Sequence, residues 1–168
     1  MNWILSALMF PIPLVHLWLH ALLPWWKKYP RLFYLCGFPL WAFSFFIFWT
    51  MNEDAAIFFA PPEMVTWIGY TLIVLGFFAM GISLVTIGPK RFFVMAVIKP
   101  ESVKNERFVS GPFHFFPHPA YIGYLAIAFG NFLSSGKNYA LGIFLFGMIL
   151  FPIVIWLEEE ELAKRIGA

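Results

Sequence analysis

Charge is scarce in this sequence, and cysteine is almost absent. Only 12% of the 168 residues are charged, whereas 61% are hydrophobic. An average soluble domain has about 25% charged residues, so a soluble globule of this length is excluded. The single cysteine, Cys36, rules out an internal disulfide and a CxxC site. The chain also contains no P-loop, GxGxxG or serine-elbow motif, which removes the common soluble nucleotide-binding and hydrolase classes.

Long apolar runs are abundant instead, and they predict an all-α integral membrane protein with about five transmembrane helices. Pro11 and Pro13 predict either a kink in the first of these helices or a late start of it. No basic residues precede that helix, so we expect it to stay in the membrane rather than to be removed as a signal peptide. We expect residues 1–168 to form a single membrane domain. The predicted spans are Trp3 to Leu23, Leu32 to Met51, Val65 to Gly88, Pro119 to Leu133 and Tyr139 to Leu157.

The fourth span is short for a membrane crossing. A helix over Pro119 to Leu133 would be about 22 Å long at 1.5 Å per residue, and a bilayer core is about 30 Å thick. The segment either crosses with help from residues 113–116 or forms one arm of a tilted hairpin. The turn at Ser134 to Asn138 predicts that the last two spans form a helical hairpin.

Basic residues predict how the chain is oriented. Every Lys and Arg except Lys137 falls between spans one and two, between spans three and four, or after span five. The opposite side carries Glu53, Asp54 and Glu63. By the positive-inside rule, the N-terminus lies outside and the C-terminus lies in the cytoplasm.

Glycine recurs along the third span, at Gly69, Gly76, Gly81 and Gly88. Small residues allow two helices to approach closely within a membrane. The alternative is that these glycines leave room for a cofactor.

Four consecutive glutamates, residues 158–161, end the fifth span. Like charges repel one another, and the C-terminus of a helix disfavours negative charge. If the helix continues into water, Glu160 and Glu161 gain partners one turn later in Lys164 and Arg165.

The first pair, Glu158 and Glu159, gains no such partner, because leucine and alanine follow one turn later. Two interpretations remain. The pair is a solvated acidic helix end, or it faces a ligand rich in hydroxyl, amine or cationic groups.

A second unusual stretch, residues 111–123, begins the hairpin. Pro117 and Pro119 flank His118, so the backbone there is extended or turned, and Pro119 suits the first position of a helix. The unpaired N–H groups of a helix start can hold a carboxylate. The simpler interpretation is a belt of Tyr and His side chains at the membrane interface.

Histidine spacing raises the alternative of a metal site. His16 and His20, and likewise His114 and His118, are separated by one helical turn, as metal ligands on a helix often are. Pro117 interrupts the second pair, however, and we expect no metal.

Two stretches together resemble the isoprenylcysteine carboxyl methyltransferase and phospholipid N-methyltransferase superfamily. Residues 108–123, FVSGPFHFFPHPAYIG, resemble its LVTSGPYxxxRHPxYxG signature, and EEEEL at 158–162 with Gly167 resembles its EExxLxxxFG element. The resemblance covers residues 65–167. It divides the chain into two N-terminal helices over 1–64 and a methyltransferase-like core over 65–168.

The resemblance implies a membrane enzyme that binds S-adenosylmethionine at the cytoplasmic face. It implies transfer of a methyl group to a lipophilic or small thiol, amine or carboxylate acceptor, without a metal. The expected partners are the lipid bilayer and this acceptor, with no nucleic acid. Matched position by position, the expected cofactor-binding residues are His118, Pro119, Tyr121, Gly123, Glu158 and Glu159.

The sequence departs from the superfamily pattern at Pro117, where the family has arginine, and at Phe113, where it has tyrosine. Two alternatives therefore stand beside the methyltransferase. One is an NADPH-dependent sterol or enoyl reductase, although such enzymes usually have asparagine at the position of Ala120 and an arginine-rich end. The other is a catalytically degenerate membrane scaffold.

Overall fold

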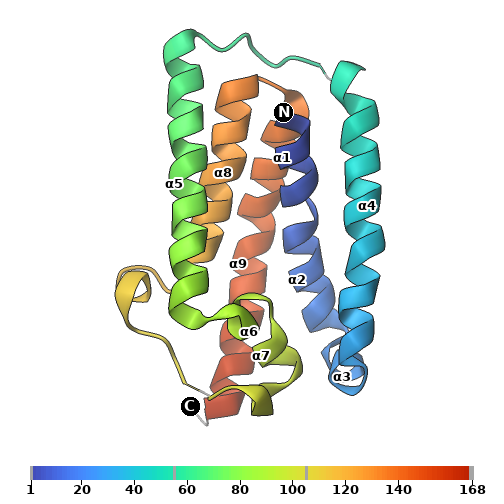
Figure 1. Ribbon diagram of the computed structural model, residues 1–168, viewed down its shortest axis with the longest axis vertical. Coiled ribbons are helices and arrows are strands. Elements are labelled where there is room, and N and C mark those ends of the chain that lie inside the picture. The colour runs from blue at the N-terminus through green and yellow to red at the C-terminus, as the bar shows by residue number, and fades with distance from the viewer. Residues whose placement is uncertain (1, 55, 105, 167–168) are drawn as a thin grey trace.

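The computed structural model describes residues 2–54, 56–104 and 106–166, and in these residues it is helical without any strand (Figure 1). Gly167 and the side chains of Glu53 and Asp54 lie outside what the structure describes. The helices in chain order are α1 (Asn2–Met9), α2 (Pro11–Ala21), α3 (Leu23–Lys28), α4 (Pro30–Asp54), α5 (Glu63–Ile87), α6 (Pro89–Phe92), α7 (Met95–Ile98), the 3-10 turns η1 (Pro100–Ser102) and η2 (Gly111–His114), α8 (Pro119–Ser135) and α9 (Asn138–Ile166).

Four stretches of helix in the described chain are long and apolar enough to cross a membrane. They correspond to the first, second, third and fifth spans predicted from the sequence, although the first ends two residues and the third one residue earlier than predicted. The fourth predicted span is α8, whose 17 residues extend about 26 Å. The all-helical class is thus confirmed, and α8 as a fifth crossing stays a prediction. The four stretches are Asn2–Ala21, Pro30–Asn52, Glu63–Ile87 and Asn138–Ile166.

The first span is divided where its prolines predict a break. Helix α1 ends at Met9, and α2 begins at Pro11. A proline at the first position of a helix needs no backbone hydrogen bond, so α2 starts there without loss. Ser44 of α4 donates to the Ala7 carbonyl (2.8 Å) and joins two N-terminal helices, whereas Asn131 of α8 donates to Ser6 (2.8 Å) and joins α1 to the rest of the bundle.

Helices α5 and α8 make the closest helix contact in the bundle. A Cβ atom at Gly76 would lie 2.5 Å from the carbonyl oxygen of Gly123, and one at Gly69 would lie 2.6 Å from that of Gly130. Such distances are sterically forbidden, so only glycine permits this backbone approach. Close packing, rather than room for a cofactor, explains these two glycines of the third span.

The other two glycines of the third span, Gly81 and Gly88, do not take part in this close contact with α8. A Cβ atom added at Gly81 would have no neighbour within 4 Å, so this glycine takes no part in the contact with α8. Gly88 has φ of 78°, a conformation that favours glycine, and it ends α5 before Pro89 begins α6.

The segment α6–α7 covers one end of the bundle, at the bottom of Figure 1. Val94 and Ile98 are buried there against Leu19, Trp26 and Phe33 of the N-terminal helices. Val94 has φ of 56°, which is unusual for a β-branched residue, and burial in this cluster holds it there.

The predicted basic loops meet at this same end. Helices α3 and α6–α7 and the C-terminal end of α9 all lie at the bottom of Figure 1, whereas the start of α1 and the turn between α8 and α9 lie at the top. The connection between α4 and α5 also lies at the top, where Phe58 donates to the Gly136 carbonyl (2.7 Å). The grouping of positive charge at one end therefore follows from the helix order.

Candidate functional site

Residues 111–123, the His-Pro stretch, meet the glutamates at the end of α9, as their shared assignment to one cofactor site implies. His118 precedes α8, and its Nε2 lies 3.1 Å from a carboxylate oxygen of Glu159, while its Nδ1 lies 3.6 Å from Glu158. The hydroxyl of Tyr121 donates a hydrogen bond to Glu158. The two glutamates that lack partners on their own helix thus take them from α8.

The prolines explain why His118 reaches α9. Its φ and ψ of −131° and 65° are not helical, as expected for a residue before proline, and Pro119 begins α8. The His118 ring stacks on the Tyr121 ring with their centroids 5.6 Å apart. The Tyr121 ring in turn stacks on that of Phe151 in α9, with a centroid distance of 4.5 Å. This stack orients the Tyr121 hydroxyl toward Glu158.

An arginine that the sequence analysis did not single out completes the cluster. Arg107, in the connection between η1 and η2, donates to the second carboxylate oxygen of Glu159. Its place just before the FVSGP stretch was the only signal in the sequence. Pro117, which stands at the arginine position of the family signature, is exposed. A guanidinium therefore reaches the glutamates from ten residues earlier in the chain.

A cavity of about 550 Å³ lies beside these residues. Its walls come from α2, α4, the end of α5, α6 with the two residues after it, η2, the start of α8 and Glu158 of α9. They are mainly apolar and aromatic. Tyr34 of α4 donates to the Phe93 carbonyl (3.0 Å), and this bond fastens α4 to the connection between α6 and α7 at the edge of the cavity. Ionisable side chains in the wall include His16, Arg91, His118, Tyr121 and Glu158.

The predicted cofactor residues occupy three different positions relative to this cavity. His118, Pro119, Tyr121 and Glu158 line it. Glu159 lies behind His118, toward Arg107. Gly123 packs against Gly76 of α5 and is not in the cavity wall. Binding of a cofactor by any of the six stays a prediction.

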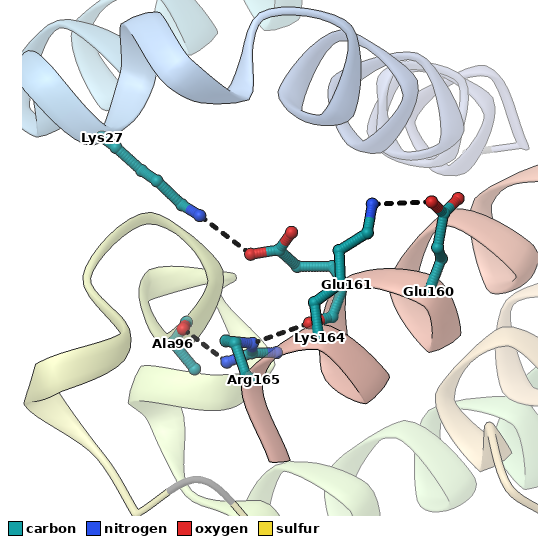
Figure 2. Close-up of polar contacts among 6 residues, drawn as sticks. All are labelled: Lys27, Ala96, Glu160, Glu161, Lys164 and Arg165. Atoms are coloured by element: carbon teal, nitrogen blue, oxygen red, sulfur yellow. Dashed lines mark hydrogen bonds and ion pairs between the residues drawn. The ribbon is translucent and has the colours of Figure 1, made fainter. Parts of the chain in front are cut away.

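The far end of α9 is fastened to two other elements, as Figure 2 shows. Glu160 pairs with Lys164 at 2.6 Å, which confirms one predicted i,i+4 pair. The other predicted pair, between Glu161 and Arg165, is replaced. The carboxylate of Glu161 turns to Lys27 of α3 at 2.8 Å.

Arg165 in turn donates to the carbonyl of Ala96 in α7 at 2.8 Å (Figure 2). The side chains of Glu161 and Arg165 do not pair with each other because tertiary packing brings other partners within reach. Helices α3 and α7 lie beside the end of α9, and Lys27 and the Ala96 carbonyl take the place of the side-chain partner one turn away on α9. The end of α9 is consequently clamped within the fold, and Glu161 keeps only 14% of its side chain exposed.

Metal-binding groups are dispersed in the part of the chain that the structure describes. It contains no group of three or more His, Cys, Asp or Glu side chains arranged to hold a metal ion. His16 binds the Ile12 carbonyl through Nδ1 at 2.8 Å, and His114 is exposed on η2, apart from the cavity.

Comparison with known proteins assigns the family. The family model described as phospholipid methyltransferase matches residues 64–167, which run from α5 to the end of α9. No curated protein and no solved structure matches the chain. The match includes both the His-Pro stretch and the glutamates that the structure joins, and it agrees with the resemblance found in the sequence. The chain therefore belongs to the phospholipid methyltransferase family, within the superfamily of membrane methyltransferases that also contains the isoprenylcysteine carboxyl methyltransferases.

Proposed function

We propose that the protein transfers the methyl group of S-adenosylmethionine to a lipophilic or small thiol, amine or carboxylate acceptor at the cytoplasmic face of a membrane. The observation that carries this proposal is the cluster formed by His118 and Tyr121 with Glu158 and Glu159, at the wall of a large cavity. Both halves of the cluster lie within the stretch that matches the methyltransferase family.

The polar groups at the cavity suit the proposed methyl donor. Carboxylates accept hydrogen bonds from ribose hydroxyls and from an amino group, and Glu158 faces the cavity. The buried hydroxyl of Tyr124, in the same wall, has no hydrogen-bond partner among the described residues. Pro119 has no N–H, and the N–H groups of Tyr121 and Ile122 bond to the His118 carbonyl. The N–H of Ala120 is then the first-turn donor of α8 best placed for the donor's carboxylate.

The reaction needs orientation more than activation by the protein. Bound S-adenosylmethionine supplies a methyl carbon that is already activated by a positively charged sulfur. The protein's part is to hold acceptor and donor in line and to exclude water. Packed aromatic rings around Tyr121 provide such a rigid setting.

The cavity also suits an acceptor that comes from the bilayer. Phe38 of α4 lines the cavity and is 74% exposed on the outer surface of the bundle. Phe93 lines it as well and is 56% exposed. An apolar chain in the lipid can thus enter beside α4 without crossing water.

The proposal also specifies orientation and span count. We propose that the end carrying α3, α6–α7 and the C-terminal end of α9 faces the cytoplasm, because nearly all Lys and Arg residues gather there. In this arrangement α8 also crosses the membrane, as a fifth span. It leaves the cytoplasmic end at His118, and α9 returns to that end with Glu158 and Glu159.

Calorimetry on the purified protein in detergent tests the donor class. We expect S-adenosylhomocysteine to bind and NADPH not to bind. Binding of NADPH alone would select a reductase, and binding of neither nucleotide would leave only the scaffold. Vesicles that contain the protein, a tritiated methyl donor and one candidate acceptor then identify the acceptor by counting label in the lipid phase.

A further inference from the structure

The imidazole of His16 is held in one tautomer. Its Nδ1 lies 2.8 Å from the carbonyl oxygen of Ile12, one turn earlier in α2. A carbonyl oxygen can only accept, so Nδ1 must carry the hydrogen. In the neutral ring, the other nitrogen, Nε2, then has a free lone pair.

This ring belongs to the cavity wall that also contains His118, Tyr121 and Glu158. The His16 and Tyr121 rings form a T-shaped pair, with their centroids 5.7 Å apart and their planes at 86°. One side of the imidazole is thus fixed by its own helix and another by α8. Within the described residues, no group is hydrogen-bonded to Nε2 of His16.

Most of the other ionisable groups of the wall are already engaged, and the hydroxyl of Tyr124, which has no partner among the described residues, belongs to a neutral phenol and not to a base. His118 lies between both glutamates, and Glu158 accepts from Tyr121. Arg91 donates to the Lys104 carbonyl at 2.7 Å and cannot accept a proton. Pro117, at the arginine position of the family signature, has no side chain that could take part in proton transfer. His16 is left as the wall residue whose basic nitrogen is uncommitted in the described chain.

We propose that Nε2 of His16 is the general base of the methyl transfer, and that the acceptor is accordingly an amine or a thiol. This inference rests on the proposed function. An ammonium or thiol acceptor must lose a proton before its electron pair can attack the methyl carbon, whereas a carboxylate is already deprotonated at neutral pH. His16 lies outside residues 64–167, so this role belongs to the N-terminal part of the chain and not to the family signature.

The step balances in atoms and in charge. The N–H or S–H bond of the acceptor breaks, and its proton binds Nε2. The electron pair left on nitrogen or sulfur forms the new bond to the methyl carbon. The bond from that carbon to the sulfonium breaks, and its electron pair returns to sulfur. One positive charge is lost at sulfur and one appears on His16, so the net charge of the cavity does not change.

The test compares His16→Asn with His114→Asn. Asparagine keeps a side-chain N–H that can reach the Ile12 carbonyl, but it has no counterpart of Nε2. His114 is exposed and outside the cavity, so its substitution is the matched control. Each protein is placed in vesicles with a tritiated methyl donor and with dodecylamine, dodecanethiol or palmitate. S-adenosylhomocysteine affinity is measured in parallel by calorimetry.

We expect the wild type to methylate the amine or the thiol. We expect His16→Asn to lose about 100- to 10,000-fold in turnover while its S-adenosylhomocysteine affinity changes less than about threefold. His114→Asn should match the wild type in both. Undiminished turnover by His16→Asn would overturn the inference alone, as would a wild type that methylates only palmitate or none of the three. Failure of the wild type to bind S-adenosylhomocysteine would overturn the proposed function as well.

Two further readouts separate a base from a structural residue. Nitrogen NMR of histidine-labelled protein should show His16 with a hydrogen on Nδ1 and none on Nε2, and the reverse assignment contradicts the proposal. Added imidazole should restore part of the turnover of His16→Ala, because the free base can occupy the space left by the side chain. Absence of any recovery, with nucleotide binding intact, also counts against it.

Discussion

Lys27 of α3 and Glu161 of α9 form an ion pair of 2.8 Å between residues 134 positions apart in the sequence. This pair joins the N-terminal helices to the end of the helix that carries the site glutamates. Together with the bond from Arg165 to Ala96, it fixes α9 against both α3 and α7. One of these two contacts comes from α3, which lies outside the family match.

Loss of this ion pair should lower stability modestly. Lys27→Met leaves Glu161 without its partner, and we expect a decrease of about 0.2–1 kcal/mol, since the lysine is partly exposed. The measurement is thermal unfolding in detergent at low salt. Lys28→Met is the control, because Lys28 lies over the Tyr29 ring and not beside Glu161. The double variant of Lys27→Met and Glu161→Gln should lose less than the sum of the two, and simple additivity would argue against the pair.

Glu158 should be required for binding of the nucleoside, unlike its neighbour Glu160. Glu158→Gln removes a charged acceptor that lines the cavity, and a hydrogen bond to a charged group contributes about 1.5–3 kcal/mol. We therefore expect S-adenosylhomocysteine affinity to decrease about 10- to 100-fold. Glu160→Gln should change it less than about twofold, because Glu160 is exposed and pairs only with Lys164 among the described residues. Calorimetry with S-adenosylhomocysteine on both variants tests this prediction. Equal affinities of the two variants would contradict the assignment of Glu158 to the nucleoside site.

The helix pattern and the meeting of the two signature stretches could be predicted from the sequence. Uncharged runs define spans by their length, and the spacing between His118 and Glu159 places both at the same end of a hairpin. The partner of Glu161 could not be predicted in this way. Local spacing favours Arg165, and only the three-dimensional approach of α3 brings Lys27 within reach.

The cavity was equally hidden from sequence reasoning. Its walls come from α2, α4, α5, α6, η2, α8 and α9, and nothing local in the sequence marks residues that face a common space. Arg107 was missed for the same reason, because its contact with Glu159 joins a loop to a helix 52 positions away. For Gly123, the family signature predicts a cofactor contact, and this stays a prediction. The structure adds a packing role that local sequence does not show, the close approach of α5.

Gly76 should be among the positions least tolerant of a side chain. A Cβ there would lie 2.5 Å from the Gly123 carbonyl oxygen and 2.6 Å from Ile127, so Gly76→Ala forces α5 and α8 apart. We expect a loss of about 1–3 kcal/mol, as for overpacked cores. Gly81→Ala in the same helix has no atom within 4 Å and should be neutral or stabilising by up to about 1 kcal/mol. Thermal unfolding of both variants tests the contact, and similar melting temperatures would show that the helices do not approach in this way.

Gly37 offers a way to separate the acceptor from the methyl donor. It lies in the α4 wall of the cavity, far from the glutamates in sequence, and a Cβ there would meet only the Trp41 ring at 3.6 Å. Gly37→Leu should therefore fold, and its side chain should occupy space that an apolar acceptor needs. We expect the KM for a long-chain acceptor to rise about tenfold, or ~1.4 kcal/mol of binding, while S-adenosylhomocysteine affinity stays the same.

Gly142→Leu is the matched control for this substitution. Gly142 lies on the exposed side of α9, with no atom within 4 Å of an added Cβ. The same leucine there should change neither KM nor nucleotide affinity. If Gly37→Leu weakens S-adenosylhomocysteine instead and leaves the acceptor KM unchanged, the donor occupies the part of the cavity beside α4, and the acceptor must approach from the side of α8. The acceptor KM and the S-adenosylhomocysteine affinity, measured on these two variants, therefore determine which molecule the N-terminal helices contact.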